Sequence, residues 1–131
     1  MARLVLDPDM SAVPRARHWA ADGCAEHHLG APARAVVELL VSEAVANAVE
    51  HGSGPVRLDL DRDPGTGRLH LAVHDEGRQL PVLRHVGATA TAGRGIALID
   101  RLAAAWGSVP DAPGKTVWFD VDPDAGLRAA A

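Results

Sequence analysis

A carboxylate and an amide lie one helical turn apart in the stretch SEAVANAVEHG, residues 42–52, where Glu43 and Asn47 interrupt small apolar side chains. Residues four apart share one side of an α-helix, and both fall at the margin of the apolar stripe. Two interpretations stay open: a solvated edge of a core helix, or two half-buried oxygen groups beside a hard cation such as Mg²⁺. The spacing alone does not decide between them.

A second carboxylate closes a stretch of alternating residues, RLHLAVHDEG. Asp75 follows Leu69, Leu71 and Val73 at a spacing of two, so it is expected to point toward the same inward face of a strand. A carboxylate there must find donors or bear a large desolvation cost. Gly77 permits close approach of a flat ligand. The pair suits recognition of an exocyclic amine, such as N6 of adenine; an ordinary Asp-Gly turn is the alternative.

The stretch AGRGIAL, residues 92–98, joins a glycine-containing segment to a helix. Backbone N–H groups of Gly93, Arg94 and Gly95 could face an anion at the helix N-terminus, where the helix dipole favours negative charge. A glycine hinge is the alternative. Leu98 stands where a dinucleotide-binding motif has its third glycine, and no strand comes directly before, so that motif is rejected.

Other candidate motifs do not form sites. GKT at residues 114–116 is not a P-loop, because Gly107 and Gly114 are separated by six residues instead of four and a strand pattern follows. His27 and His28 diverge by about 100° on a helix and cannot chelate one ion together. Cys24 is the single cysteine and is expected to be a small core residue.

The elements that carry these residues alternate in type along the chain. Apolar alternation followed by Pro, Gly and Asp turns predicts a strand pair, and longer apolar-periodic stretches predict helices. A segment without periodicity at 76–93 is expected to be a loop. We expect strands at 3–7, 56–61, 68–75 and 115–121, helices at 12–29, 32–51 and 94–107, Ser11 as a helix cap, and a short extra strand near 106–109. This order predicts an α+β sandwich of two layers, a mixed but mainly antiparallel sheet with helices on one face.

Length and composition limit the classes of function. The 131 residues, 47% of them hydrophobic, predict a single domain over 1–131, with a core at about 3–122 and a frayed tail at 123–131. The net charge of −4 argues against direct nucleic-acid binding. No stretch approaches the roughly 20 apolar residues of a membrane span, so we expect a cytoplasmic protein without a membrane partner.

In sequence order, these stretches resemble the histidine-kinase-type ATPase family, whose nucleotide-binding architecture is the Bergerat fold. ELLVSEAVANAVEHG resembles its N box, HDEG its first glycine box, GRGIALIDRLA its second, and GKTVWFDV its closing strand. Within that family the stretches are most similar to the small anti-sigma-factor serine/threonine kinases of the RsbW type.

The resemblance implies a role for each residue. Glu43 matches the proposed general base and Asn47 the Mg²⁺ ligand. Asp75 matches the residue that binds adenine, and Gly77 the glycine packed at the base. At the phosphates and beside adenine, the matching residues are Gly93, Arg94, Gly95 and Thr116. Glu50 departs from the family pattern, because relatives often carry a basic or apolar residue there.

The resemblance also implies a function. An ATP- and Mg²⁺-dependent kinase would regulate transcription by holding a sigma factor and phosphorylating a serine or threonine of a STAS-type anti-anti-sigma protein. The alternative is an ATP-binding adaptor that sequesters its regulatory partner without phosphoryl transfer. Whether the chain forms a homodimer stays open. The catalytic domain of a histidine kinase is not expected, because no dimerising helix pair with an acceptor His fits before Arg3.

Overall fold

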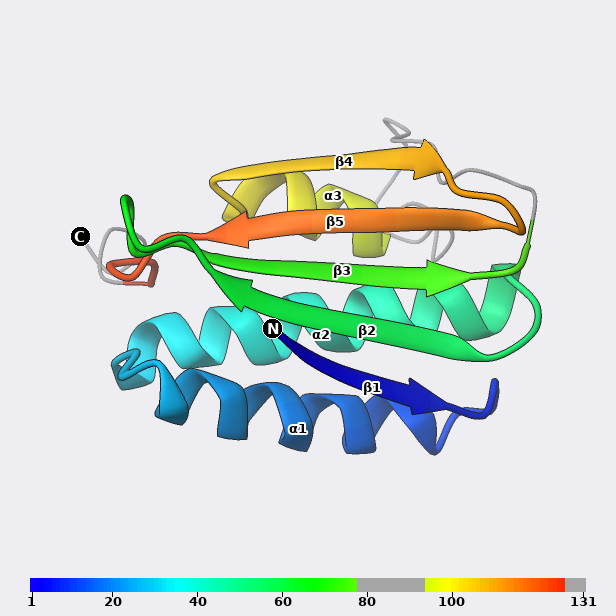
Figure 1. The fold of residues 1–131 in the computed structure, drawn as a ribbon, viewed down its shortest axis with the longest axis horizontal. Coiled ribbons are helices and arrows are strands. Elements are labelled where there is room, and N and C mark those ends of the chain that lie inside the picture. The colour runs from blue at the N-terminus through cyan, green and yellow to red at the C-terminus, as the bar shows by residue number, and fades with distance from the viewer. Residues whose placement is uncertain (78–93, 127–131) are drawn as a thin grey trace.

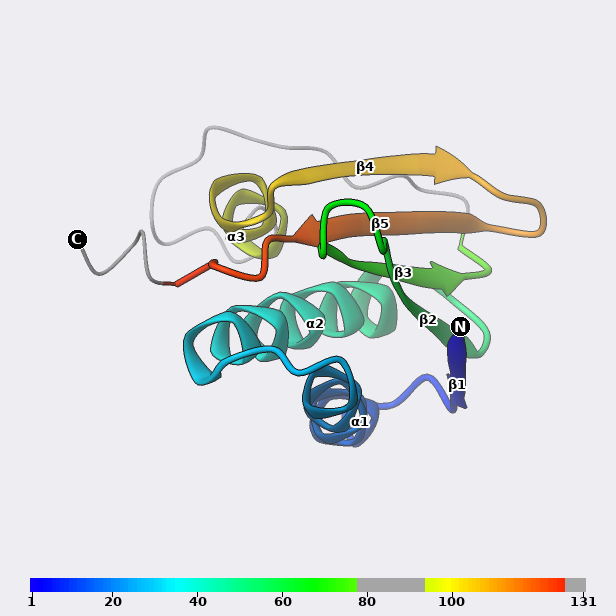
Figure 2. The same ribbon diagram turned by 60° about the vertical axis from the view of Figure 1, so that its left-hand side comes forward.

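The protein has two layers, an open sheet and three helices packed on one of its faces (Figures 1 and 2). The computed structural model describes residues 1–77 and 94–126. In chain order the elements are β1 (Ala2–Leu6), α1 (Ala12–Glu26), α2 (Ala31–His51), β2 (Val56–Arg62), β3 (Leu69–Asp75), α3 (Arg94–Leu102), β4 (Ala105–Pro110) and β5 (Lys115–Val121).

The sheet has the order β1-β2-β3-β5-β4, and each neighbouring pair of these strands is antiparallel. The predicted α+β sandwich with helices on one face is therefore confirmed. The prediction of a mixed sheet is wrong for the described strands. Short turns impose this direction on β2 with β3 and on β4 with β5, and the longer segments between β1 and β2 and between β3 and β5 also return the chain in the antiparallel direction.

The core fills the space between the sheet and the helices. Strand residues alternate between a buried inward face and an outward face, as the pattern of β5 shows. Helix α1 contributes mostly small side chains to the core, so it approaches the sheet closely: a Cβ on Gly23 would lie 2.8 Å from Leu60 Cδ1. Helix α2 lies beside α1, and its buried residues are Ala33, Val37, Leu40, Val41, Ala44, Val45 and Ala48.

Two helix boundaries differ from the sequence-based expectation. The third helix ends at Leu102 instead of 107, and the alanine-rich residues that follow turn into β4. Ala104 N–H already donates to Asp120 O at 2.8 Å, so pairing with β5 outweighs the helix propensity of alanine. The short extra strand predicted near 106–109 is confirmed, with wider bounds. The first helix ends at Glu26, before His28 adopts a left-handed backbone with φ 60°.

The expected cap at the start of the first helix is also wrong. Ser11 makes no side-chain capping bond to the helix, and its own backbone is already helical. Its hydroxyl instead donates to the Asp9 carboxylate, which also accepts from Ser11 N–H at 2.9 Å.

Four chain segments meet at one end of the molecule, on the right in Figure 1. Helix α2 and strand β3 end there, strand β5 begins there, and α3 points its N-terminus the same way. The predicted site residues belong to these segments. Among the described residues, no helix is both long and apolar enough to cross a membrane.

Candidate functional site

Asp75 is buried at the end of β3. It is 2% exposed, as the alternation of the strand predicts. Its Oδ1 accepts a hydrogen bond from Gly77 N–H at 2.7 Å and another from Lys115 Nζ at 3.1 Å. The lysine is equally hidden, with 1% of its surface exposed. Asp75 is thus both a turn-forming aspartate and an inward-facing buried carboxylate.

A glycine cradle formed by Gly52 and Gly77 surrounds this carboxylate. A Cβ on Gly52 would lie 2.4 Å from both Cγ and Oδ1 of Asp75, and one on Gly77 would lie 2.8 Å from Gly52 Cα. Neither position can carry a side chain without displacing the other groups. Glu76 N–H also donates to Ser53 O at 2.8 Å, which fastens the segment after α2 to the end of β3.

Helix α2, which ends at the glycine cradle, carries Glu43 and Asn47 as half-buried side chains one turn apart. Within the described part of the chain, neither side chain has a recorded hydrogen bond or ion pair. Asn47 lies about one turn before the end of the helix at His51, where Gly52 touches Asp75. Glu50 is exposed, and its Oε2 lies 3.7 Å from His51 Nε2, so this acidic residue faces solvent.

The structure offers few protein ligands for a metal. Among the residues that can be described, no group of three or more His, Cys, Asp or Glu side chains could hold an ion. Mg²⁺ often uses one or two protein oxygens together with water and substrate phosphates. The Asn47 amide oxygen fits that minimal donor set, and Glu43 adds a carboxylate one turn away.

The phosphate-binding prediction falls partly outside the described residues. Gly93 lies outside them, and Arg94 and Gly95 form the start of α3, although the side chain of Arg94 also lies outside the described part. Helix α3 packs against α2 and turns its N-terminus toward the end of the molecule that holds Asp75 (Figure 1). Unpaired backbone N–H groups of a first helical turn suit an anion.

A family model described as "Histidine kinase-like ATPase domain" matches residues 6–120. The chain belongs to this family. Membership implies ATP binding. No curated protein matches the chain.

Solved structures share the fold of this ATPase domain. The RsbU and RsbW domains of Rv1364c from Mycobacterium tuberculosis match with a TM-score of 0.70 and 21% identity, over 93% of this chain and 32% of that one. The blue-light activated histidine kinase of Erythrobacter litoralis EL346 matches with a TM-score of 0.57 and 23% identity, over 79% of this chain and 34% of that one. A structure of its histidine kinase domain matches with a TM-score of 0.54 and 18% identity, over 91% of this chain and 62% of that one. The chain thus spans about a third of the first two proteins, and identities this low show the fold alone.

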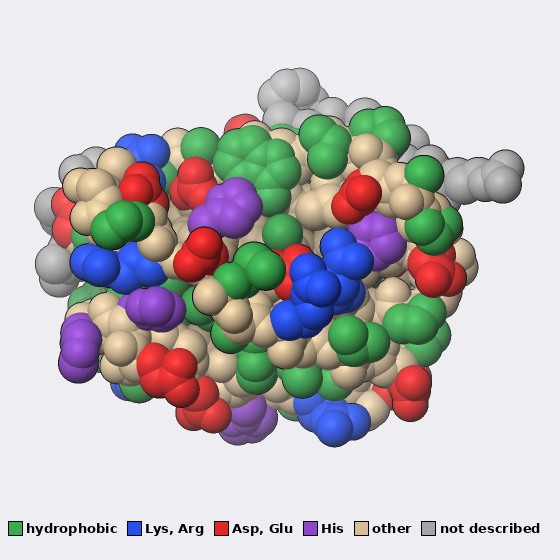
Figure 3. All heavy atoms as spheres, in the orientation of Figure 1, with side chains coloured by type: hydrophobic (Ala, Val, Ile, Leu, Met, Phe, Trp, Pro, Cys, Tyr) green, Lys and Arg blue, Asp and Glu red, His purple; other side chains and the backbone are tan. Residues whose placement is uncertain are grey.

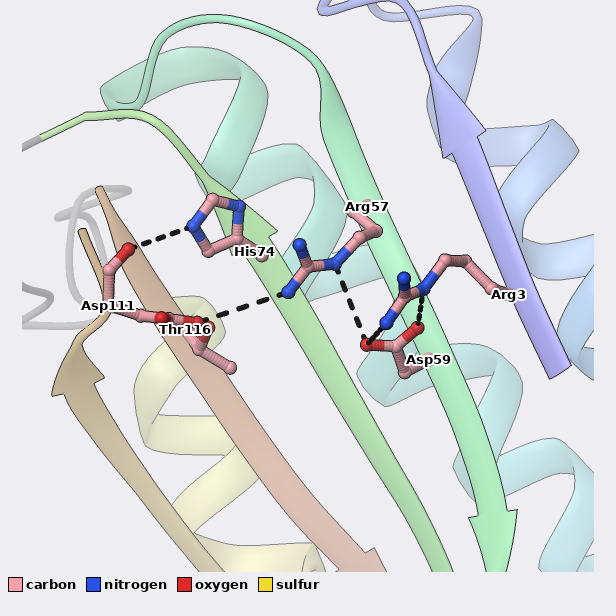
Figure 4. Close-up of polar contacts among 6 residues, drawn as sticks. All are labelled: Arg3, Arg57, Asp59, His74, Asp111 and Thr116. Carbon is pink, nitrogen blue, oxygen red and sulfur yellow. Dashed lines mark hydrogen bonds and ion pairs between the residues drawn. The ribbon is translucent and has the colours of Figure 1, made fainter. Parts of the chain in front are cut away.

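The structure does not bring Thr116 of this ATPase domain together with Asp75. Thr116 lies on the opposite, open face of the sheet, where its Oγ1 donates to Asp111 Oδ2 at 2.8 Å (Figure 4). On this face basic, acidic and histidine side chains lie next to one another (Figure 3). Strand alternation gives the reason: Val117, Phe119 and Val121 point inward, so Thr116 must point outward.

Lys115, which the sequence-based reasoning did not include, occupies the inward position instead. It is the direct cross-strand partner of Asp75 in the β3–β5 register. The inward direction of Lys115 follows from the alternation of the strand, because Lys115 stands two residues before the inward-facing Val117. The same alternation directs Thr116 outward. A lysine at an inward strand position requires a buried partner, and Asp75 supplies it.

Proposed function

We propose that this ATPase domain is an anti-sigma regulatory factor that acts as an ATP-dependent serine/threonine kinase on a STAS-type anti-anti-sigma protein. The observation that supports the proposal is that Asp75, within its glycine cradle, packs against the end of α2, the helix that carries the half-buried Glu43 and Asn47. This arrangement suits a bound nucleotide with a metal and a base near its phosphates.

Adenine would lie against Gly77, and its exocyclic amine would donate to the Asp75 carboxylate. Backbone N–H groups of Gly93, Arg94 and Gly95 would face the phosphates at the start of α3. Asn47 would supply a protein oxygen to Mg²⁺, which keeps water and phosphate oxygens as its other ligands. Glu50 is exposed, so in this proposal its negative charge faces solvent and does not oppose the triphosphate.

In the transfer step, the hydroxyl oxygen of the partner's serine or threonine bonds to the γ-phosphorus while the bond from that phosphorus to the bridging oxygen breaks and ADP leaves. Glu43 orients the hydroxyl and accepts its proton late. Positioning and charge neutralisation provide most of the rate gain in such reactions. A base in this role contributes roughly 10² to 10⁴ in rate.

The partners in this proposal are a sigma factor, which the protein holds, and a STAS-type anti-anti-sigma protein, which it phosphorylates. The sequence features shared with RsbW-type kinases support this choice of partners, and one structure with the same fold includes an RsbW domain. Self-association as a homodimer and a cytoplasmic site of action belong to the same proposal.

The test is incubation of the purified chain with Mg-ATP and candidate STAS proteins, followed by intact-mass measurement of each. We expect one STAS protein to gain a single phosphoryl group. Glu43→Gln should bind Mg-ATP as tightly as the wild type and transfer at least about 100-fold more slowly. Asn47→Ala should lose ATP affinity in Mg²⁺ much more than in EDTA.

Two outcomes would change the account. Transfer by Glu43→Gln at the wild-type rate would make that residue structural. ATP binding and partner retention without transfer to any STAS protein would favour the second function, an adaptor that sequesters its partner.

A further inference from the structure

Lys115 is the single lysine of the sequence, and it is buried where a strand normally places an aliphatic residue. It begins β5, and its inward neighbours on that strand are Val117, Phe119 and Val121. Its backbone is held tightly, because Gly114 before it has φ 104° and a Cβ there would lie 1.9 Å from Asp75 O. The lysine is therefore fixed beside Asp75 from both the backbone and the side chain.

Fold stability does not explain this choice of residue. Removing an ammonium and a carboxylate from water costs several kcal/mol per ion, and well-packed apolar residues at such a pair are often as stable or more so. Both side chains are about 2% exposed, so the desolvation is nearly complete. Recognition of a ligand is one role that such a buried pair can fill.

The contacts between Asp75 and its neighbours leave one acceptor oxygen and one cationic donor for a ligand. Gly77 N–H and Lys115 Nζ both bond to Oδ1 of Asp75, and within the described part of the chain no donor to Oδ2 is recorded. An ammonium has three N–H donors, and Asp75 uses one of them. A free acceptor oxygen and a free cationic donor thus lie side by side, with 3.1 Å between Nζ and Oδ1.

This pair is complementary to one edge of adenine. On that edge the N6 amine is a donor and the neighbouring N1 is an acceptor. We propose that Lys115 is a second base-reading residue, which donates a hydrogen bond to N1 while Asp75 accepts from N6. The inference rests on the proposed nucleotide site. A base that reaches the buried carboxylate also reaches the ammonium, since the two are in contact.

The pair also sharpens the choice of base. Guanine in the same orientation would turn its O6 acceptor toward Asp75 and its N1–H donor toward Lys115. Both contacts would then be mismatched, and a buried polar group left without its partner carries a large cost.

The experiment is calorimetric titration of the whole chain in Mg²⁺ with ATP, with 1-deaza-ATP, whose N1 is replaced by C–H, and with purine riboside triphosphate, which lacks the N6 amine. We expect the wild type to bind 1-deaza-ATP roughly 10- to 100-fold more weakly than ATP. Lys115→Met should weaken ATP binding by a similar factor and should no longer distinguish the two nucleotides.

Arg57→Met is the matched control. Arg57 lies on β2 and pairs with His74, the residue before Asp75, on the opposite face of the sheet. The variant removes a cation there and should still bind ATP more tightly than 1-deaza-ATP, as the wild type does. If Lys115→Met does not fold by circular dichroism, Lys115→Gln replaces it. That variant keeps an N–H donor without the charge, and its ratio between the two affinities should be smaller than in the wild type.

Equal binding of ATP and 1-deaza-ATP by the wild type would overturn the inference and leave Lys115 as the counter-ion of Asp75 alone. Undiminished discrimination by the lysine variants would also overturn it, because the donor to N1 would lie elsewhere. If purine riboside triphosphate binds as well as ATP, Asp75 does not read N6 and the proposed site itself fails. Absence of any adenine-nucleotide binding would end both the function and the inference.

Discussion

Neighbouring residues near the end of β3 lie on opposite faces of the sheet and have opposite surroundings. On the helix-covered face, Asp75 and Lys115 form an ion pair with both side chains 2% exposed. On the open face, His74 Nε2 lies 3.1 Å from Asp111 O, and Thr116 bonds to the Asp111 carboxylate, which is 48% exposed (Figure 4). A shift of one residue along a strand thus exchanges the helix-covered face for the open one, although His74 itself is still buried, with 9% of its surface exposed.

The open face carries several further ion pairs around the same row. Arg57 Nε lies 3.6 Å from Asp59 Oδ2, and Arg3 Nε bonds to Asp59 Oδ1 at 2.6 Å. Water competes for the exposed Arg3 in its pair with Asp59, so that pair contributes little to stability, whereas Arg57 Nε is buried without a hydrogen-bond partner in the described part of the chain. The comparison teaches that the number of charged contacts does not locate the site. The single buried pair does, because its charges have no water to replace a lost partner.

The largest effect is expected from breaking the buried pair. Asp75→Ala leaves the Lys115 ammonium buried without its partner, which should lower the free energy of unfolding by about 3–5 kcal/mol. The double variant Asp75→Leu with Lys115→Met should recover most of that loss, because no charge remains buried. Urea unfolding measures both. A loss under about 1 kcal/mol in the single variant would mean that the ammonium reaches solvent.

The glycine cradle should be the next most sensitive feature. Gly52→Ala places a Cβ 2.4 Å from the Asp75 carboxylate, so we expect a loss of about 1–3 kcal/mol in stability and weaker ATP binding. Gly65→Ala is the control, since its Cβ would meet Asp63 Oδ1 at an ordinary 3.4 Å on an exposed turn. That variant should change stability by no more than about 0.5 kcal/mol. Equal effects of the two substitutions would contradict the cradle.

Cys24 provides a buried ionisable group that folding keeps neutral, in contrast to the charged pair. Burial, with a smaller effect from Glu38, raises the pKa of the Cys24 thiol from 9.0 to about 11. Between pH 9 and 11 the unfolded chain releases this proton while the folded chain keeps it, so stability should fall as the pH rises. Cys24→Ala should lose stability less steeply over that range. Identical slopes in urea unfolding would show that the thiol ionises equally in both states.

The smallest effect is expected on the open face. Thr116→Val removes the hydroxyl that bonds to the exposed Asp111, and water can replace it there. The change in stability should be below about 1 kcal/mol, and ATP affinity should stay at the wild-type value. A tenfold or greater loss of ATP affinity would restore Thr116 to the site.

Much of the fold could be predicted because its signals are local. The alternation in residues 69–75 and the apolar periodicity of residues 31–51 each gave the correct element within a residue or two. The third helix was extended too far because Ala103, Ala104 and Ala105 favour helix by propensity. Their pairing with β5 is a contact across the sheet, which propensity does not contain.

The site was partly predictable for the same reason. The inward direction of Asp75 follows from its own strand and is confirmed. The partnership of Asp75 with Lys115 depends on the register between β3 and β5, two strands separated by many residues. The alternation of Val117 and Phe119 directs Thr116 outward, whereas the resemblance to the family implies a place for it beside adenine.

The central claim is that the end of β3 reads adenine, and a calorimetric comparison of ATP with GTP tests it most directly. With Mg²⁺ present, the wild type should bind ATP at least about 100-fold more tightly than GTP, because guanine turns an acceptor toward the buried Asp75 carboxylate. Asp75→Asn, which nearly keeps the size of the side chain, should lose most of this preference. Equal affinities of the wild type for ATP and GTP would contradict the account.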